Sequence, residues 1–454
     1  MTIETAASTL PALGAFVTRG SPPAAARLRA ARAILDTVGV TLAGAVEPAS
    51  RAVQNVIGAD GGGACGVLGT SLRTNASSAA IANGTAAHAL DYDDMCFVSL
   101  AHPSAPLVSA LLAAGAQTGA SGQDLTAAYL IGFEIEARLG RLMNPRHYQR
   151  GWHCTSTLGA IGAAAACSRL LGLDARGAAN AMAIAASEAS GLKENFGTMV
   201  KPLHAGLAAR DGVLAALLAR RGMTASELAI DGPQGFLRAM DSERDDLARE
   251  AADLGSRWEV LDTGITVKLY PSCAGTHPTL DAILALRALH AITAADVDRV
   301  EIDVDRIVPT ILIYDRPSTG LEAKFSMPFC AAAAIVFGRV GLETFDEGGL
   351  LDPRVVSLMP RIRMNVDPAL GVDAPALTQS RVRVYLRDGR LLTGAANGAR
   401  GYPATPASDG ELETKFLSCA ERTIPASSAR KALGLLRDIE RVADVRELMA
   451  CVVL

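Results

Sequence analysis

The sequence predicts two domains: a large all-α domain built from both ends of the chain, and a smaller α+β domain inserted between them. Its 454 residues exceed what one hydrophobic core ordinarily serves. Apolar residues recur every three or four positions up to about residue 265, alternate with charged residues from about 266, and return to the helical spacing after Tyr402-Pro403. We therefore assign residues 1–265 and 396–454 to the helical domain and residues 266–395 to the α+β domain, whose strands we expect to be antiparallel.

The helical domain is expected to contain long, Ala- and Gly-rich helices that pack closely. Ser121 and Asp124 have the spacing of a capping box, Asp174 can cap another helix, and Gly222 can stop a third. The apolar periodicity predicts helices over 22–44, 76–87, 105–116, 125–142, 156–171, 174–191, 205–221, 410–421 and 426–442.

The α+β domain is predicted from alternating apolar residues. Strand patterns lie at 300–304, 362–366, 382–386 and 391–393, and Asp388-Gly389 can turn the third strand back into the fourth. Helical patterns at 281–290 and 323–338 lie between them, so we expect helices on one face of a sheet.

Composition excludes several classes of protein. The net charge is -4 and no Lys/Arg run exceeds a pair, which argues against a nucleic-acid partner. The N-terminus does not resemble a signal peptide, and the uncharged runs are too interrupted to cross a membrane. The 8 cysteines lack zinc spacing and are expected to be reduced thiols. We therefore expect a cytoplasmic protein with no membrane partner.

The most unusual stretch is HALDYDDM at residues 88–95, followed by AHPS at 101–104. It places three carboxylates, Asp91, Asp93 and Asp94, and two imidazoles, His88 and His102, between two Ala-rich helical patterns that look buried. Burying a charge costs several kcal/mol unless the charge is paired or used. This stretch is therefore a candidate site.

Three further stretches combine imidazoles, hydroxyls or lysines with Pro or Gly. They contain Tyr148, His153 and Thr155; Lys201 and His204; and Lys268 and His277. A helix N-terminus directly after His153 can receive a carboxylate and would keep that imidazole neutral. A single lysine is more often a surface residue, but two lysines in Pro-containing turns, each followed by a His, favour a carboxylate-binding cleft.

The chemistry expected from these residues is proton abstraction next to a carboxylate, with cations stabilising the enediolate. Histidine suits proton transfer at neutral pH. Asp91 would need a raised pKa to act as an acid, which neighbouring Asp93 and Asp94 would supply. These carboxylates could instead hold Mg²⁺, but a second acidic cluster is missing, as are the common nucleophile, phosphate-loop, zinc and dinucleotide motifs.

The four stretches resemble those of a known family. Together with YDRP at 314–317, EAKFS at 322–326 and SDGELETKF at 408–416, they follow in order the pattern of the MmgE/PrpD family, also called the 2-methylcitrate dehydratase family. The resemblance implies a helical domain from both chain ends, an α+β lid domain, a site between them, a homodimer, and no metal or organic cofactor. Known members include 2-methylcitrate dehydratase, cis-aconitate decarboxylase and iminodisuccinate epimerase.

The resemblance also implies site residues. Carried over position by position, the family's site falls on Asp91, His102, His153, Lys201, Lys268, His277 and Tyr314, with Tyr148 as a weaker candidate. Thr155 and His204 are further candidates for substrate binding. Met95 stands where the decarboxylase-like and dehydratase-like members have Thr, and the spacer to His102 also differs. This departure argues against cis-aconitate and 2-methylcitrate as substrates.

We predict a cofactor-free lyase that removes water from a small di- or tricarboxylate. Lys201 and Lys268 would bind carboxylates, and His153 or His102 would take the proton. Asp91 would act as an acid or orient the base, while His277 and Tyr314 would complete the pocket from the lid. The alternatives are an epimerase of a dicarboxylate, a decarboxylase, and a non-catalytic dimer that binds a carboxylate.

Overall fold

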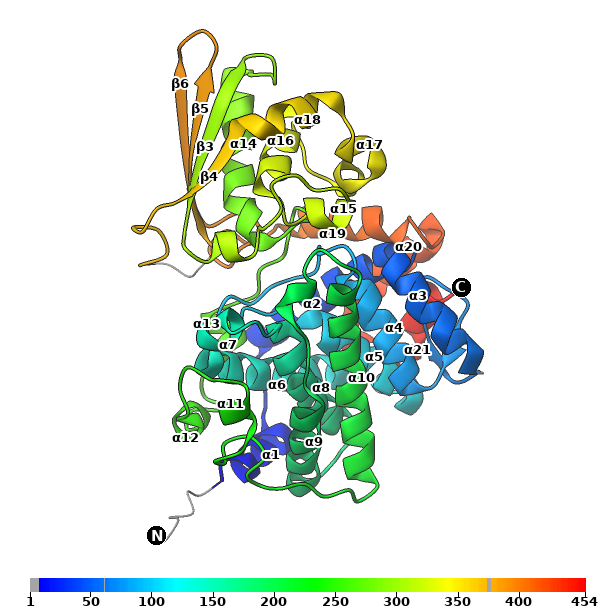
Figure 1. Cartoon of the computed structure of the whole chain (residues 1–454). Coiled ribbons are helices and arrows are strands. Elements are labelled where there is room, and N and C mark those ends of the chain that lie inside the picture. The colour runs from blue at the N-terminus through cyan, green and yellow to red at the C-terminus, as the bar shows by residue number, and fades with distance from the viewer. Residues whose placement is uncertain (1–7, 61, 374–376) are drawn as a thin grey trace, which may run out of the picture.

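The computed structural model describes residues 8–60, 62–373 and 377–454 and has a helical body and a sheet body (Figure 1). The sheet body comprises β3–β6 with α14–α18. The helical body contains α1 (Leu10–Arg19), α2 (Ala24–Gly44), α3 (Pro48–Ile57), α4 (Ala76–His88), α5 (Ser104–Thr118), α6 (Gly122–Met143), α7 (Arg146–Gln149), α8 (Cys154–Leu170), α9 (Ala175–Glu188), α10 (Val200–Arg220), α11 (Phe236–Ala239), α12 (Leu247–Ala251) and α13 (Glu259–Asp262), a short antiparallel pair of β1 (Cys65–Gly66) with β2 (Arg73–Thr74), and the C-terminal α19 (Asp409–Ala420), α20 (Ala426–Arg437) and α21 (Arg446–Val452).

Small residues let the central helices approach closely. Helix α10 packs against α4 and α8, and α8 packs against α6. A Cβ atom added at Gly84 of α4 would lie 2.8 Å from the Cα atom of Gly206 in α10. Only glycine permits that backbone distance. The contact brings the C-terminal end of α4 next to the N-terminal end of α10, where His88 and Lys201 lie.

The C-terminal helices return to the helical body, as predicted. Helix α19 packs against α2, and the buried Lys415 of α19 lies 2.7 Å from Asp36 of α2. The same ammonium donates a hydrogen bond to the carbonyl of Tyr92 at 2.8 Å. The end of the chain therefore supports the loop that carries Asp91, Asp93 and Asp94.

The sheet body contains a four-stranded sheet of order β4-β3-β5-β6, with α14 packed against β5 and β6 and α16 packed against α14 and β4 (Figure 1). Its elements are α14 (His277–His290), β3 (Val297–Val304), α15 (Gly320–Ala323), α16 (Met327–Phe337), α17 (Glu347–Leu350), α18 (Pro353–Leu358), β4 (Ile362–Val366), β5 (Gln379–Leu386) and β6 (Leu391–Asn397).

The prediction of an entirely antiparallel sheet was wrong for one pair. Strands β3 and β5, and β5 and β6, are antiparallel, whereas β3 and β4 are parallel. Alternating apolar residues show which face of a strand is buried but not its direction. The connection from β3 to β4 contains α15–α18, and a crossover of that kind lets the chain enter β4 in the same direction as β3.

Most predicted helices occur within a few residues of their expected bounds. The capping box at Ser121 and Asp124 is present ahead of α6. All eight cysteines are buried and free. Within the described residues, no helix is both long and apolar enough to span a bilayer. The domain limits proposed from the sequence, 1–265 with 396–454 and 266–395, stay a prediction.

Candidate active site

The candidate site forms where helix ends of the helical body meet the first segment of the sheet body. His88 is the last residue of α4, and the loop after it carries Asp91, Asp93 and His102. His153 is the N-cap residue of α8. Lys201 lies in the first turn of α10, and Lys268 lies between α13 and α14. All seven side chains are buried.

Asp91 lies between two ammonium groups. Its Oδ1 accepts a hydrogen bond from Lys201 Nζ at 2.7 Å, and its Oδ2 accepts one from Lys268 Nζ at 3.0 Å. Lys268 also donates to the Asp91 carbonyl at 2.9 Å. Asp91 has a φ of 51°, a left-handed conformation that Asp tolerates better than most residues. This conformation places the carbonyl oxygen and the Oδ2 atom of Asp91 at the same ammonium, that of Lys268.

The expected raised pKa of Asp91 was wrong. Burial alone would raise the pKa of this carboxyl, but the charges of Lys201 and Lys268 outweigh burial and hold the pKa well below its usual range. The sequence shows like charges at Asp93 and Asp94 but not the lysines that fold onto Asp91. The carboxylate is therefore ionised and poorly suited to act as a general acid.

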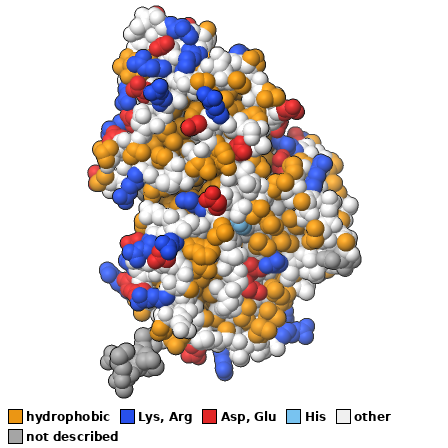
Figure 2. Space-filling model, viewed as in Figure 1, with side chains coloured by type: hydrophobic (Ala, Val, Ile, Leu, Met, Phe, Trp, Pro, Cys, Tyr) orange, Lys and Arg blue, Asp and Glu red, His pale blue; other side chains and the backbone are white. Residues whose placement is uncertain are grey.

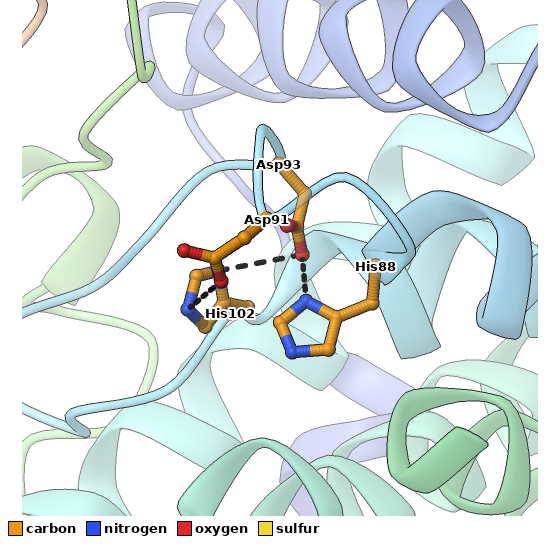
Figure 3. Close-up of side chains that lie close together, drawn as sticks. All are labelled: His88, Asp91, Asp93 and His102. Carbon is orange, nitrogen blue, oxygen red and sulfur yellow. Dashed lines mark hydrogen bonds and ion pairs between the residues drawn. The ribbon is translucent and has the colours of Figure 1, made fainter. Parts of the chain in front are cut away.

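Asp93 contacts two imidazoles (Figure 3). Its Oδ2 lies 2.8 Å from His88 Nδ1 and 3.3 Å from His102 Nδ1. The other ring nitrogen of His88 is 2.6 Å from Lys201 Nζ, while His102 Nε2 is 3.8 Å from Asp91 Oδ1. Burial lowers the pKa of His88 to about 4 and also lowers that of His102. Both imidazoles are therefore neutral at pH 7.

Asp94 faces away from the other two carboxylates. It accepts hydrogen bonds from the Ser104 backbone N–H at 3.3 Å and contacts the Ser104 hydroxyl, which in turn lies 2.6 Å from the Tyr129 hydroxyl. Burial raises the pKa of Asp94 to about 8. A magnesium site made of Asp91, Asp93 and Asp94 together is thereby excluded.

Another group of four side chains, His88, Asp91, Asp93 and His102, has ligand atoms within 4.8 Å of one another. However, both Asp91 oxygens already bind ammonium groups, and Lys201 also occupies His88 Nε2. A divalent cation would be buried beside two like charges. The donor set is therefore better suited to lysine than to a metal.

His153 and His204 form a second pair of imidazoles. Their Nδ1 atoms are 3.0 Å apart, so one donates and the other accepts. Burial lowers the pKa of His204 to about 4 and holds the pKa of His153 well below its usual value, with the charge of Lys201 acting in the same direction on both. The expected neutral His153 is therefore confirmed. Thr155 accepts a hydrogen bond from the His102 backbone N–H at 3.0 Å and so positions that residue.

A small cavity of about 20 Å³, room for about one water molecule, lies against this cluster. Of the predicted site residues, Asp91, His102, Tyr148, His153 and Lys201 line it. Lys268, Thr155 and His204 lie behind that lining, in contact with Asp91, His102 and His153. A substrate of several carbons needs a larger space, so the site is closed in this structure.

Two predicted residues do not reach the cavity lining. His277 Nε2 lies 3.1 Å from the Ser272 carbonyl, and burial lowers the pKa of His277 to about 3. Tyr314 donates a hydrogen bond from its hydroxyl to the Phe196 carbonyl at 2.9 Å. Tyr314 thereby links the sheet body to the loop that covers the site.

Sequence reasoning gave His88 and Asp93 no individual role in the site and missed Phe196. His88 and Asp93 were part of the quoted stretch, and their spacing of five residues across a helix end gave a weak signal. Phe196 gave no signal in the sequence. Its ring centre lies 4.9 Å from that of His153 and 5.7 Å from that of Phe325, and the residue lines the cavity.

Two family models match the chain: the MmgE/PrpD N-terminal domain over residues 15–247 and the MmgE/PrpD C-terminal domain over residues 270–441. Among curated relatives, the cis-aconitate decarboxylase-like protein oryM of Aspergillus oryzae is 28% identical over 95% of this chain and 93% of its own length. Cis-aconitate decarboxylase of Homo sapiens is 27% identical over 82% of this chain and 78% of its own length. Cis-aconitate decarboxylase of Mus musculus is 29% identical over 81% of this chain and 76% of its own length.

Proposed function

The chain belongs to the MmgE/PrpD family of enzymes, and we propose that it is a lyase that removes water from a small hydroxylated di- or tricarboxylate without a metal or organic cofactor. One observation carries the choice of reaction: a neutral imidazole, that of His102, lines the cavity beside two ammonium groups. A neutral base next to cations suits removal of a proton beside a carboxylate.

His102 is the proposed base. Nδ1 lies 3.3 Å from the Asp93 carboxylate without hydrogen-bond geometry, and we propose that this negative charge favours the tautomer with the proton on Nδ1 and the lone pair on Nε2. Nε2 takes the proton from the carbon next to the substrate carboxylate. The electron pair left on that carbon forms the carbon–carbon double bond as the bond to the leaving hydroxyl breaks.

Lys201 is the proposed anion-binding group, supported by Lys268. A substrate carboxylate would compete with Asp91 for Lys201 Nζ, while Lys268 keeps Asp91 neutralised. The ammonium then stabilises the negative charge that develops on the carboxylate oxygens. Tyr148, whose pKa burial raises well above its usual value, stays protonated and can supply the proton with which the hydroxyl leaves as water.

Decarboxylation is the second candidate because the similar proteins are named cis-aconitate decarboxylase. That reaction needs an acid that delivers a proton to carbon and has no need of a base. An epimerase would instead return the proton from the other face of the substrate, which needs a second acid/base group, and Tyr148 and His153 also line the cavity.

Incubation with candidate hydroxy acids and unsaturated acids in deuterated water separates these reactions. A dehydratase yields a product lighter by one water, a decarboxylase releases carbon dioxide, and an epimerase returns substrate that contains solvent deuterium. His102→Gln should abolish the loss of water, and exhaustive chelation should leave it unchanged. Carboxylate binding without any of these products would contradict the proposal and favour a binding protein.

Access to the closed cavity is proposed to depend on the sheet body acting as a lid. Its residues Ile311, Phe325 and Leu377 line the cavity together with Asp91 of the helical body, so separation of the two bodies would open the site. The homodimer implied by the family resemblance stays a prediction.

A further inference from the structure

The cavity has two chemically different walls. The polar residues all belong to the helical body: Asp91, His102, Tyr148, His153 and Lys201. The rest of the lining is apolar or carries only a thiol: Met95, Leu100, Phe196, Cys273, Ala274, Ile311, Phe325 and Leu377. The five that come from residues 266–395 include no charged side chain. The wall that would close over a substrate therefore presents apolar side chains and one thiol, and no charge.

Cationic charge at the cavity is limited. Lys201 and Lys268 share the single carboxylate Asp91, which neutralises one of them. Two other lysines do not line the cavity: Lys324 donates to the Pro271 carbonyl at 2.8 Å, and Lys193 lies 4.1 Å from the centre of the Tyr148 ring. Lys201 can hold one substrate carboxylate, and the neutral polar groups Tyr148 and His153 of the lining can hydrogen-bond a second. A third would be buried against apolar side chains without a polar partner, which is costly.

The geometry points to a hydroxylated dicarboxylate with a short alkyl arm as the substrate class, an inference that rests on the proposed function. One carboxylate lies at Lys201, and the alkyl arm packs against Met95, Ile311 and Phe325, where a tricarboxylate would place a third charge. Pockets of this kind, mostly apolar with a few polar groups, orient a ligand through the polar groups and bind it through its apolar surface.

The surface around the site also carries apolar side chains. Leu192, Met199 and Ile313 are 54%, 51% and 56% exposed in the segments that flank Phe196 and Tyr314. Figure 2 shows hydrophobic side chains gathered around a histidine at the waist between the two bodies. An apolar rim favours entry of a molecule with an alkyl arm.

A matched pair of ligands tests the inference. In 2-isobutylmalate an isobutyl group replaces one carboxymethyl arm of citrate, so the two molecules have the same shape and differ by one charge. We expect 2-isobutylmalate to bind at least about tenfold more tightly than citrate, measured by calorimetry and by the shift of the thermal midpoint. Citramalate, with only a methyl arm, should bind more weakly than 2-isobutylmalate.

Two variants of Met95 test where the alkyl arm of the substrate binds. Met95→Gln should weaken the binding of 2-isobutylmalate more than the binding of citrate, and so reduce the ratio of the two affinities. Met95→Ala, which keeps the wall apolar if the first variant fails to fold, should shift the preference toward a longer arm. Met223→Gln, at a position that is 47% exposed and outside the lining, is the control and should leave the ratio unchanged.

The outcomes are distinguishable from those of the proposed function. If citrate or cis-aconitate binds as tightly as 2-isobutylmalate, the inferred substrate class is wrong while the carboxylate-acting lyase stands. If no member of the set binds or turns over, both are wrong. If 2-isobutylmalate binds most tightly and loses water, both are supported.

Discussion

Lys201 donates a hydrogen bond to Nε2 of His88 at 2.6 Å, although the two residues are 113 positions apart in the chain. An ammonium cannot accept a hydrogen bond, so the ring proton of His88 must be on Nδ1, where it is donated to Asp93 at 2.8 Å. Asp93 thus fixes the tautomer of His88, and His88 in turn fixes the position of the Lys201 ammonium.

His88→Leu should therefore reduce kcat by about 10- to 100-fold, because small displacements of a positioned group are costly in catalysis. His88→Gln, whose amide oxygen can still accept from Lys201, should recover part of the loss. Steady-state kinetics together with thermal midpoints check this. A loss in both variants that follows only their thermal midpoints would mean that His88 is structural.

Asp93→Asn should weaken the proposed base His102. Burial lowers the pKa of His102 and the Asp93 charge partly restores it, so removing that charge lowers the pKa further. The acid limb of kcat/KM should move to lower pH, and kcat should fall by about 100-fold. Asp94→Asn, one residue away but directed at Ser104, is the control and should leave the acid limb in place. Equal profiles for both variants would exclude His102 as the base.

Asp94 should make the protein less stable as pH rises. Burial raises its pKa to about 8, so between its unfolded value of 3.8 and pH 8 the folded state holds a proton that the unfolded state has lost. Stability from this proton is present at low pH and is lost as pH rises through about 8. Asn cannot lose the proton, so the thermal midpoint of Asp94→Asn relative to the native chain should increase from pH 5 to pH 9. Asp298→Asn, which changes an exposed carboxylate, is the control for the loss of one surface charge.

Gly197→Ala should impair the loop that covers the site. Gly197 has a φ of +84°, and an added Cβ would overlap the hydroxyl of Tyr314, which holds the Phe196 carbonyl. Gly222 has a φ of +90° with nothing within 4 Å, so Gly222→Ala carries the backbone strain alone, about 1–2 kcal/mol. Both variants should lose stability, measured by chemical denaturation, but only Gly197→Ala should raise KM. A comparable rise in KM for Gly222→Ala would contradict a specific role for the loop.

The sequence was sufficient to predict that four separated stretches form one site, because each combined unusual polar residues with helix ends. It was not sufficient to assign the three carboxylates. Asp91, Asp93 and Asp94 are nearly adjacent, yet the left-handed backbone at Asp91 sends them to two lysines, to two imidazoles and to Ser104, respectively. Their opposite pKa shifts follow from partners that only the fold supplies.

The direction of β4 and the role of Phe196 could not be predicted from the sequence for a similar reason. Alternating apolar residues show which face of a strand is buried, but the direction of β4 depends on how α15–α18 pack before it. Phe196 lies in a loop without periodicity, and its place over His153 depends on contacts with Phe325 from the other body.

The contacts of Lys415 determine when during synthesis the site can form. A ribosome makes the chain from the N-terminus, and by the time α10 emerges the chain already holds Asp91, His102, His153 and Lys201. The loop that carries Asp91 still lacks Lys268, and its Tyr92 carbonyl lacks the ammonium of Lys415, which lies 323 residues further on. Nascent chains should therefore leave this loop without its contact to Lys415 until translation is nearly finished, a period in which chaperones would be most needed.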